Sequence, residues 1–390
     1  MTELDRRAQE RLLGRRIGDV LTTHDSRAFT GQRVLVTGAG GSVGGELVRQ
    51  LAGCQPAHLA LVDHAEYQLF RIESELRRLF PGVPLSVHLG DVSRRVDIGA
   101  ACADVRPHVV FHAAAYKHVT MAERSIVPVA RTNVLGTVAT LEAARAVGAR
   151  FVLISSDKAA EPSSVMGATK RFAELVTLDQ ASPAFRPIVT RFGNILGSSG
   201  SVVEIMLRCV RDGRPVPVTD PAATRYFMTG EEAAALVMKA DRIGLGGEVF
   251  WLDMGEPIRI GDLAERIVDL ATPAAVPRVA IETIGLRPGE KMNEELTSQG
   301  LEMKRTAHAR IWRARQALVP RLDVYRALRG LRRACTRGDA SAALAAIELA
   351  VTDFTPSALA RQSAGRRPVA TPVVAARPRG SRLPVPSRAR

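Results

Sequence analysis

The chain has few cysteines and few aromatic residues, and it lacks any long apolar run. Its four cysteines form no C-x-x-C pair and adjoin no histidine cluster, so we expect reduced, buried thiols and no metal site; they are Cys54, Cys102, Cys209 and Cys335. No stretch approaches the roughly 18 apolar residues of a transmembrane helix. The charged start, "MTELDRRAQERLLGRR", lacks the apolar core of a signal peptide. These absences predict a cytoplasmic protein without a transmembrane segment.

The last 30 residues contain neither acidic nor aromatic residues. Residues 361–390 hold eight arginines, more than half of the net charge of +14 on this 390-residue chain. Their apolar residues follow no helical or strand period, so we expect a disordered, solvated basic tail. Binding to an acidic membrane surface or to nucleic acid is the alternative. Because no aromatic ring is available to stack on bases, no nucleic-acid partner is expected.

Short apolar runs alternate with amphipathic segments through the first half of the chain. Strands are predicted at 34–37, 59–63, 85–91, 109–115, 151–156 and 188–194, and helices at 43–52, 67–79, 129–146 and 165–178. Near-continuous apolar strands separated by helices are typical of a parallel sheet covered on both faces. The sequence therefore predicts an α/β fold with a Rossmann-type doubly wound parallel sheet.

A glycine-rich turn follows the first predicted strand. "TGAGGSVGGEL" spaces Gly38, Gly41 and Gly44 as G-x-x-G-x-x-G, and Ser42 and Val43 begin the next helix. Glycines allow a tight turn and close backbone approach, and a helix N-terminus offers free N–H groups to a pyrophosphate. The strand–turn–helix context makes a dinucleotide site the prediction.

Acidic residues end the next two predicted strands. Asp63 lies 19 residues after Gly44, where a carboxylate accepts hydrogen bonds from an adenosine ribose and repels a 2′-phosphate. NAD is therefore favoured over NADP, and a helix cap or loop acid is the alternative for Asp63. Asp91, with Val92 beside it, could contact the adenine amino group or be a simple turn aspartate.

The fourth predicted strand ends in three small residues, Ala113, Ala114 and Ala115. Small side chains at a carboxyl edge let a cofactor lie across the sheet, and core packing is the alternative. After about residue 195 the alternation loosens. We expect a helical N-terminal extension over 1–30, an NAD-binding Rossmann domain over 31–195, a mainly substrate-binding region over 196–330 and a C-terminal helical segment over 331–360. The substrate-binding region is smaller and interleaves with the sheet, because the strand-like segment 248–253 is expected to return to it.

The segment "ISSDKAAEPSSVMGATK" follows the fifth predicted strand. It brings Ser156, Asp157 and Lys158 to the carboxyl ends of the strands, where ligands bind in such folds. Lys170 follows on a helix. Four residues before it stands Met166, where many nicotinamide enzymes have a proton-transferring tyrosine. A thioether has no proton to exchange, so the proton chemistry lies elsewhere or the protein only binds a cofactor.

Seven motifs in this order closely resemble the nucleotide-sugar 4,6-dehydratases of bacterial polysaccharide biosynthesis, an extended branch of the short-chain dehydrogenase/reductase superfamily. The resemblance covers roughly residues 10–300, and the best-known substrate of that family is UDP-N-acetylglucosamine. The motifs are "VLVTGAGGSVGGELVRQL", "FHAAAYKHV", "TNVLGT", "ISSDKAAEPSSVMGATKR", "RFGNILGSSGSV", "TRYFMT" and "GLRPGEK".

The resemblance implies a competent enzyme, because the family has a branch with methionine at the position of Met166. Long members of that branch carry a membrane domain ahead of the catalytic part, and this chain resembles the catalytic part alone. The implied reaction oxidises C4 of the sugar by hydride transfer to NAD, eliminates water across C5 and C6, and returns the hydride to C6. Ser156 replaces the usual threonine and keeps its hydroxyl.

The resemblance and the residue chemistry together assign proton transfer jointly to Asp157 and Lys158. Lys158 is expected as the base at C5 and Asp157 as the acid at O6, with Asp157 or Ser156 also helping to deprotonate the 4-hydroxyl. Lys170 is expected to bond the nicotinamide ribose. A plain surface salt bridge is the alternative for the pair.

A UDP-sugar substrate also needs groups for its diphosphate, ribose and sugar. Family positions place Arg225 and Arg287 on the diphosphate, where a planar guanidinium makes paired hydrogen bonds. Glu290 is expected on the uridine ribose, Asn194 on a phosphate or sugar oxygen, and Lys117 and His118 near the sugar. Salt-bridged or structural roles are the alternatives for these side chains.

Two other functions stay open. A UDP-sugar epimerase shares the scaffold and the C4 oxidation, but it typically keeps the tyrosine. A catalytically silent NAD- or nucleotide-sugar-binding protein would fit Met166 alone, and the presence of Asp157, Lys158 and Lys170 argues against it. Relatives of this fold usually self-associate, so a homo-oligomer is expected. The exact sugar and the product configuration at C5 are left open.

Overall fold

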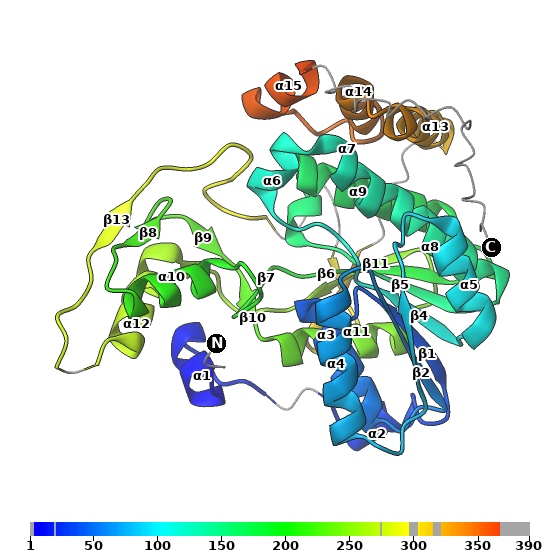
Figure 1. Cartoon of the computed structure of the whole chain (residues 1–390), viewed down its shortest axis with the longest axis horizontal. Helices are drawn as coiled ribbons and strands as arrows, with labels where there is room; N and C mark the ends of the chain where they lie inside the picture. The colour runs from blue at the N-terminus through cyan, green and yellow to red at the C-terminus, as the bar shows by residue number, and fades with distance from the viewer. Residues whose placement is uncertain (1–3, 19–20, 274, 296–302, 315–320, 367–390) are drawn as a thin grey trace, which may run out of the picture.

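The computed structural model describes residues 4–18, 21–273, 275–295, 303–314 and 321–366. Its centre is a nine-stranded sheet in the order β14-β15-β11-β6-β5-β4-β1-β2-β3 (Figure 1). In this order, each pairing from β11 across to β3 is parallel. The pairings of β11 with β15 and of β15 with β14 are antiparallel. The bounds are β1 Arg33–Thr37, β2 His58–Asp63, β3 Leu85–Leu89, β4 Val109–His112, β5 Arg150–Ile154, β6 Pro187–Arg191, β11 Glu248–Leu252, β14 Met303–Arg305 and β15 Ile311–Ala314.

This order confirms the predicted doubly wound sheet. The chain runs outward from β1 through β2 to β3, then returns across β1 to β4, β5 and β6. The order reverses between β1 and β4, and ligands of such sheets bind at the carboxyl ends beside this reversal. The segment at 248–253 does return to the sheet, as β11 beside β6.

Several strands end earlier than the sequence predicted. The predicted run 109–115 ends as a strand at His112, the run 151–156 ends at Ile154, and the run 188–194 ends at Arg191. The residues beyond these ends leave the sheet and form the loops of its carboxyl edge. Most of their side chains are small or polar and lie in loops, whereas Phe192 is buried and Asn194 begins the short strand β7, Asn194–Ile195.

Helices cover both faces of the sheet and divide the core in two. One apolar cluster joins the sheet to α3 Ser42–Gly53, α4 Glu66–Leu79 and α11 Gly230–Ile243. The other joins it to α5 Arg95–Val105, α6 Val119–Arg124, α7 Ile126–Ala130, η1 Arg131–Gly136, α8 Thr137–Ala146 and α9 Val165–Asp179. Every residue of α9 from Val165 to Leu178 is buried, because this helix has protein on both of its sides.

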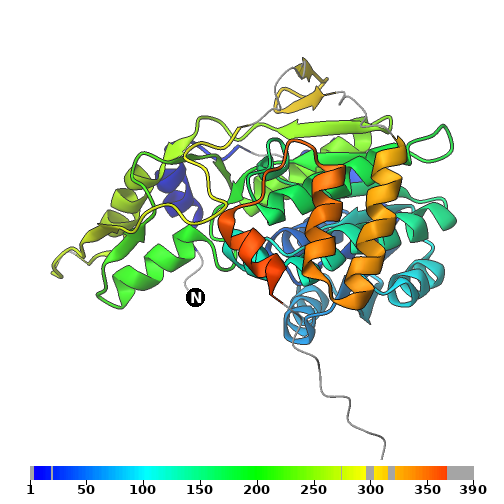
Figure 2. The ribbon, with the colours of Figure 1, turned by 90° about the horizontal axis from the view of Figure 1, so that it is seen from above.

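The outer cover of α9 comes from the end of the chain. Helices α13 Arg321–Arg337, α14 Ala340–Ala350 and α15 Ala358–Gly365 lie outside α6, α7 and α9 (Figures 1 and 2). The helical segment thus begins before the expected residue 331. It also runs past residue 361, because α15 starts at its N-cap Ser357, which accepts from Ala360 N, and ends at Gly365. The prediction of a disordered tail from residue 361 is therefore wrong for the residues up to Gly365, which are helical. Residues 367–390 lie outside the described residues.

A smaller region beside the carboxyl ends of the strands has its own apolar core (Figure 1). It contains α10 Val202–Arg211, α12 Ile260–Ala271 and three two-stranded sheets, and the N-terminal helix α1 Arg6–Leu13 packs on α12. A second N-terminal helix, α2 Thr23–Arg27, precedes β1. The small sheets pair β7 Asn194–Ile195 with β10 Phe227–Met228, β9 Thr224–Arg225 with β12 Ile258–Arg259, and β8 Val216–Val218 with β13 Ile281–Thr283.

Within the described part of the chain, no helix has the length and apolar character needed to cross a membrane. A homo-oligomer stays a prediction.

Candidate active site

The glycine turn between β1 and α3 is too tightly packed for side chains. Gly38 has φ +66°, and a Cβ there would lie 2.7 Å from Ala114 N. A Cβ on Gly44 would lie 2.0 Å from Gly38 O. Helix α3 begins at Ser42 after Gly41, which supplies no side-chain cap to the first turn. The free N–H groups of that turn therefore remain available to an anion.

Asp63 holds this turn from the end of β2. Its carboxylate is buried and accepts from Gly40 N and from Ala65 N, both at 2.9 Å. Asp91 makes a similar local contact after β3, where Oδ1 accepts from Ser93 N at 2.8 Å. Both acids lie at the carboxyl edge of the sheet, as expected, and both also stabilise their own turns. Their contacts with a cofactor stay predictions.

Neighbouring small residues complete the cradle beside the turn. Val92 is buried against Gly136, where an added Cβ would lie 2.9 Å from a Val92 methyl group. Ala113, Ala114 and Ala115 follow β4 and are half-buried, and the Ala114 backbone lies against Gly38. The close approach of these backbones leaves no room for a side chain at Gly38. This geometry fits the predicted dinucleotide.

The structure brings the predicted proton-transfer residues together after β5. Asp157 Oδ1 accepts from Ser156 Oγ at 2.7 Å, Lys158 N at 2.8 Å and Lys158 Nζ at 3.0 Å. Lys158 Nζ also donates to Asn194 Oδ1 at 3.4 Å. Asp157 Oδ2 is buried, and no described residue donates a hydrogen bond to it. Asp157 Oδ1 thus accepts the hydrogen bonds that hold Ser156 and Lys158 in place, and Oδ2 accepts none from the described residues.

Lys158 lies close to two carboxylates. Burial lowers its pKa, but the carboxylates of Asp157 and Glu294 outweigh burial, so the pKa of Lys158 is raised above its ordinary value. Glu294 Oε1 lies 3.7 Å from Lys158 Nζ. The resting lysine is therefore an ammonium ion, and it must lose its proton before it can act as the expected base at C5. Sequence reasoning did not identify Glu294.

Helix α9 carries Met166 and Lys170 into the site. Ser164 caps it by accepting from Gly167 N at 3.1 Å. Met166 is buried in the apolar core, and its thioether has no proton to exchange. Lys170 Nζ donates to Ile154 O at 2.6 Å, at the carboxyl end of β5. Burial lowers the pKa of Lys170 to about 8, with Glu174 opposing the shift.

Glu123, on α6, ties the start of α9 to the C-terminal helices. Its Oε1 accepts from Val165 N at 2.7 Å, and its Oε2 accepts from Ser357 Oγ at 2.5 Å. Burial raises the pKa of Glu123. Sequence reasoning missed this residue, because a lone acid in "MAERS" gives no sign that it is buried and that its partners come from distant segments.

The two arginines predicted to hold a diphosphate lie in different surroundings. The Arg225 guanidinium donates to the carbonyl oxygens of Thr224, Lys291 and Met292 at 2.7–2.9 Å. It thereby anchors the loop that follows β13. The Arg287 side chain is exposed, and the backbone N–H of Arg287 donates to Glu290 Oε2 at 3.1 Å. Contact with a diphosphate stays a prediction for both, and Arg225 would have to exchange partners to make it.

A loop after β7 bridges the glycine turn and the predicted sugar side. Lys117 Nζ donates to Ser198 Oγ at 3.1 Å, and Ser199 N donates to Ser42 Oγ at 3.1 Å. Gly200 is packed so closely that a Cβ there would lie 2.6 Å from His118 Cε1. Burial lowers the pKa of Lys117, and burial together with Lys117 lowers that of His118. The loop thus brings Ser42, Lys117 and His118 together.

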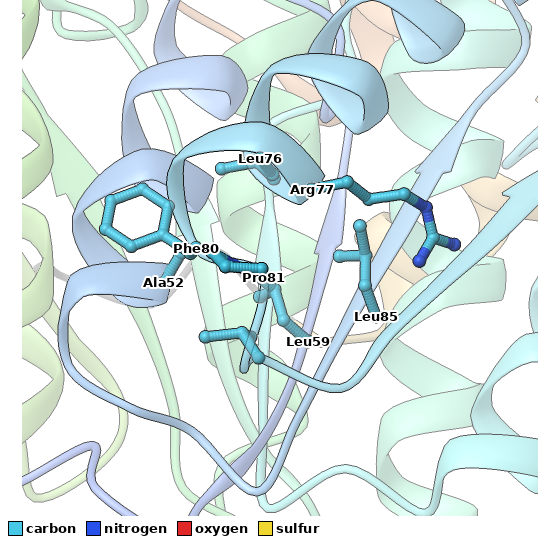
Figure 3. Close-up of a pocket in the computed structure, with 8 residues that line it drawn as sticks. Ala52, Leu59, Leu76, Arg77, Phe80, Pro81 and Leu85 are labelled. Atoms are coloured by element: carbon cyan, nitrogen blue, oxygen red, sulfur yellow. The ribbon is translucent and has the colours of Figure 1, made fainter.

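A small pocket of about 110 Å³ lies elsewhere, at the amino-terminal ends of β2 and β3 (Figure 3). It is distant from the carboxyl edge that carries the glycine turn and the Asp157–Lys158 pair. Its lining is mostly apolar and consists of Ala52, Leu59, Leu76, Arg77, Phe80, Pro81, Val83 and Leu85. This lining supplies no proton-transfer chemistry.

Comparison with known proteins matches residues 34–316 to the polysaccharide biosynthesis protein family. The probable polysaccharide biosynthesis protein EpsC of Bacillus subtilis is 41% identical over 324 residues, covering 82% of this chain and 52% of the relative. The chain thus spans about half the length of that relative. A UDP-N-acetylglucosamine 4,6-dehydratase (inverting) of Campylobacter jejuni is 30% identical over 277 residues, covering 69% of this chain and 78% of the relative.

Solved structures show the same fold. Pen from Bacillus thuringiensis has a TM-score of 0.70 at 29% identity, covering 75% of this chain and 90% of its own. DesIV, a dTDP-glucose 4,6-dehydratase of Streptomyces venezuelae solved with NAD bound, has a TM-score of 0.59 at 21% identity, covering 68% of this chain and 88% of its own. With this fold and the family match over residues 34–316, the chain belongs to the polysaccharide biosynthesis protein family, of the extended short-chain dehydrogenase/reductase type.

Proposed function

We propose that the chain catalyses the NAD-dependent 4,6-dehydration of a UDP-hexose, with UDP-N-acetylglucosamine as substrate and UDP-4-keto-6-deoxy-N-acetylhexosamine as product. The observation that carries this proposal is the pair formed by the buried Asp157 and the half-buried Lys158, which lies at the carboxyl edge of the sheet. The C. jejuni relative named for this reaction supports the choice of substrate.

The residues around the glycine turn fit a dinucleotide. Gly38 and Gly44 leave no room for side chains, α3 offers free N–H groups, and Asp63 fixes the turn. These residues would hold NAD, with Lys170 on the nicotinamide ribose. When bound, the nicotinamide supplies the acceptor for hydride from C4 and the donor that returns it to C6.

The protein's own groups move the protons. Asp157, linked to the Ser156 hydroxyl, takes up the proton of the 4-hydroxyl as C4 becomes a ketone. The ketone acidifies the C5 proton, which Lys158 accepts after it has released its own ammonium proton to solvent. Asp157 then protonates O6 as the C6–O6 bond breaks, so water leaves and a C5–C6 double bond forms. A solvent proton at C5 and hydride at C6 complete the product.

The first test is incubation of the purified protein with UDP-N-acetylglucosamine in deuterated water without added cofactor. We expect the nucleotide sugar to lose one water by mass spectrometry and to gain deuterium at C5. An unchanged mass with an altered sugar configuration by NMR would replace the proposal with the epimerase. No change with any UDP- or dTDP-hexose would leave only a binding protein.

The epimerase is the weaker alternative on chemical grounds. It shares the C4 oxidation, in which Asp157 takes up the 4-hydroxyl proton, but it needs neither a base at C5 nor an acid at O6, so it would leave Lys158 without a task. Met166 also removes the tyrosine that an epimerase typically keeps.

Asp63→Asn should weaken NAD binding and reduce the discrimination against NADP. The variant removes the negative charge that opposes a 2′-phosphate and disturbs the hydrogen bonds to Gly40 N and Ala65 N. Hydrogen bonds to charged groups contribute about 1.5–3 kcal/mol, so NAD affinity should fall roughly ten- to a hundredfold. Calorimetric titration with both cofactors measures the ratio. Asp104→Asn, at an exposed position, is the matched control. An unchanged NAD/NADP ratio in Asp63→Asn would contradict the assignment.

A further inference from the structure

A carboxylate from the loop after β13 lies against the proton-transfer pair. Glu294 Oε1 is 3.7 Å from Lys158 Nζ and 3.7 Å from Arg225 Nε. The Glu294 side chain is only 8% exposed, and that of Lys158 is 19% exposed. Charges this sheltered are screened much less by salt than charges on an open surface. The proton chemistry proposed above makes no use of Glu294.

The loop is held in this position by hydrogen bonds next to Glu294. Arg225 donates to Lys291 O and Met292 O. Thr224 N donates to Met292 O at 2.9 Å, and Thr224 Oγ1 donates to Asn293 Oδ1 at 2.8 Å. These bonds lie on consecutive residues just before Glu294, so they fix the direction in which its side chain enters the site.

The charges around Lys158 balance only when Glu294 is included. Lys158 and Arg225 are cations, and Asp157 and Glu294 are anions. Asn194, which also contacts Lys158 Nζ, is neutral. Burial and Arg225 lower the pKa of Lys158, whereas Asp157 and Glu294 raise it and prevail. Removing the charge of Glu294 would leave Asp157 as the remaining anion among these neighbours.

We propose that Glu294 is a positioning residue for proton transfer, which fixes the place and the charge of Lys158 Nζ from the loop that also carries Arg287 and Glu290. The proposal deepens the proposed dehydratase function and rests on it for its catalytic meaning. Glu294 would thereby connect the loop of Arg287 and Glu290, which is predicted to bind the nucleotide, to the charge of Lys158, the predicted base at C5.

The first experiment measures the charge of Lys158 without any turnover. The chain has only six lysines, so ¹³Cε-lysine labelling gives few NMR signals, and Lys158→Arg identifies the one from Lys158. In Glu294→Gln this signal should titrate at lower pH than in the unmodified protein, because one anion has been neutralised. Glu295→Gln is the matched control, since Glu295 is the adjacent acid and is exposed. Identical titrations in Glu294→Gln and the unmodified protein would overturn the proposal.

The second experiment follows the pH dependence of kcat for water elimination. With Lys158 as the base, a lower pKa moves the acidic limb of the profile to lower pH, and Glu294→Gln gains relative activity there. A shift of one pKa unit changes the fraction of neutral amine about tenfold at a fixed pH below the pKa. With Lys158 as the acid, the basic limb moves to lower pH instead. Either shift supports the proposal.

A purely structural role for Glu294 gives a different pattern. It would raise KM or lower kcat equally at every pH, with unshifted limbs and an unshifted lysine signal, and that result overturns the proposal. A shifted Lys158 signal in a protein that dehydrates no nucleotide sugar would refute the proposed function while supporting the link between Glu294 and Lys158.

Discussion

Replacing Lys158 by methionine is expected to lower the rate of water elimination by about 10²–10⁴-fold, the usual contribution of one positioned acid–base group. Methionine approximates the length of the lysine chain but has no proton to transfer. The hydrogen bonds of Asp157 Oδ1 with Ser156 Oγ and with the backbone N–H of residue 158 can persist. The loss is therefore confined to the Nζ group. Steady-state turnover of UDP-N-acetylglucosamine measures it.

A single-turnover measurement shows which step the variant loses. Oxidation of C4 depends on Asp157 and Ser156 in the proposed scheme, so Lys158→Met should still reduce the bound nicotinamide and then stall. The ultraviolet absorbance of the reduced cofactor should rise and persist. Lys239→Met is the control, since Lys239 pairs with Asp25 and is outside the proposed machinery. Turnover of Lys158→Met close to that of the unmodified chain would refute the assignment of Lys158.

The parts of the site that could be predicted from sequence are local in the chain. Gly38, Gly41 and Gly44 lie in one turn, and Asp157 and Lys158 are adjacent, so a single strand end positions each set. A parallel sheet then brings the strand ends to one edge, which relates these sets to each other without further information. This explains why both sets could be predicted at the carboxyl edge of the sheet; their roles in binding and proton transfer stay predictions.

The remaining features depend on contacts between distant segments. Glu294 reaches Lys158 only because Arg225 and Thr224 fix the intervening loop. From the sequence alone, an Arg225 whose guanidinium contacts a phosphate cannot be distinguished from one whose guanidinium contacts three backbone carbonyls. Likewise, the C-terminal helices look like any amphipathic segment, and only packing shows that they cover α9. Long-range partners of this kind have no periodicity or spacing that a single sequence could reveal.

The buried ion pair between Arg191 and Glu174 is another feature that sequence reasoning missed. Arg191 is fully buried at the end of β6, and its Nε and Nη2 donate to the two carboxylate oxygens of Glu174 on α9. Ser155 Oγ donates to the same carboxylate at 2.5 Å, and the guanidinium lies 5.0 Å from the Trp251 ring centre. The pair thus connects α9 to the residue that precedes Ser156 and Asp157.

Arg191→Met should cost about 3–5 kcal/mol in the free energy of unfolding, because it leaves the Glu174 carboxylate buried without its main partner. Urea unfolding measures the loss. Replacing both members, Arg191→Met with Glu174→Leu, should recover much of it, since apolar substitution of a whole buried pair is often neutral. The incomplete bonding of Arg191 favours this recovery, because its Nη1 has no acceptor among the described residues.

If Arg191→Met alone stays within about 1 kcal/mol of the unmodified protein, the charge of the Glu174 carboxylate is relieved by water or by Arg171. If instead the double variant regains stability but dehydrates slowly, the pair serves to hold the end of β5 for catalysis rather than to stabilise the fold.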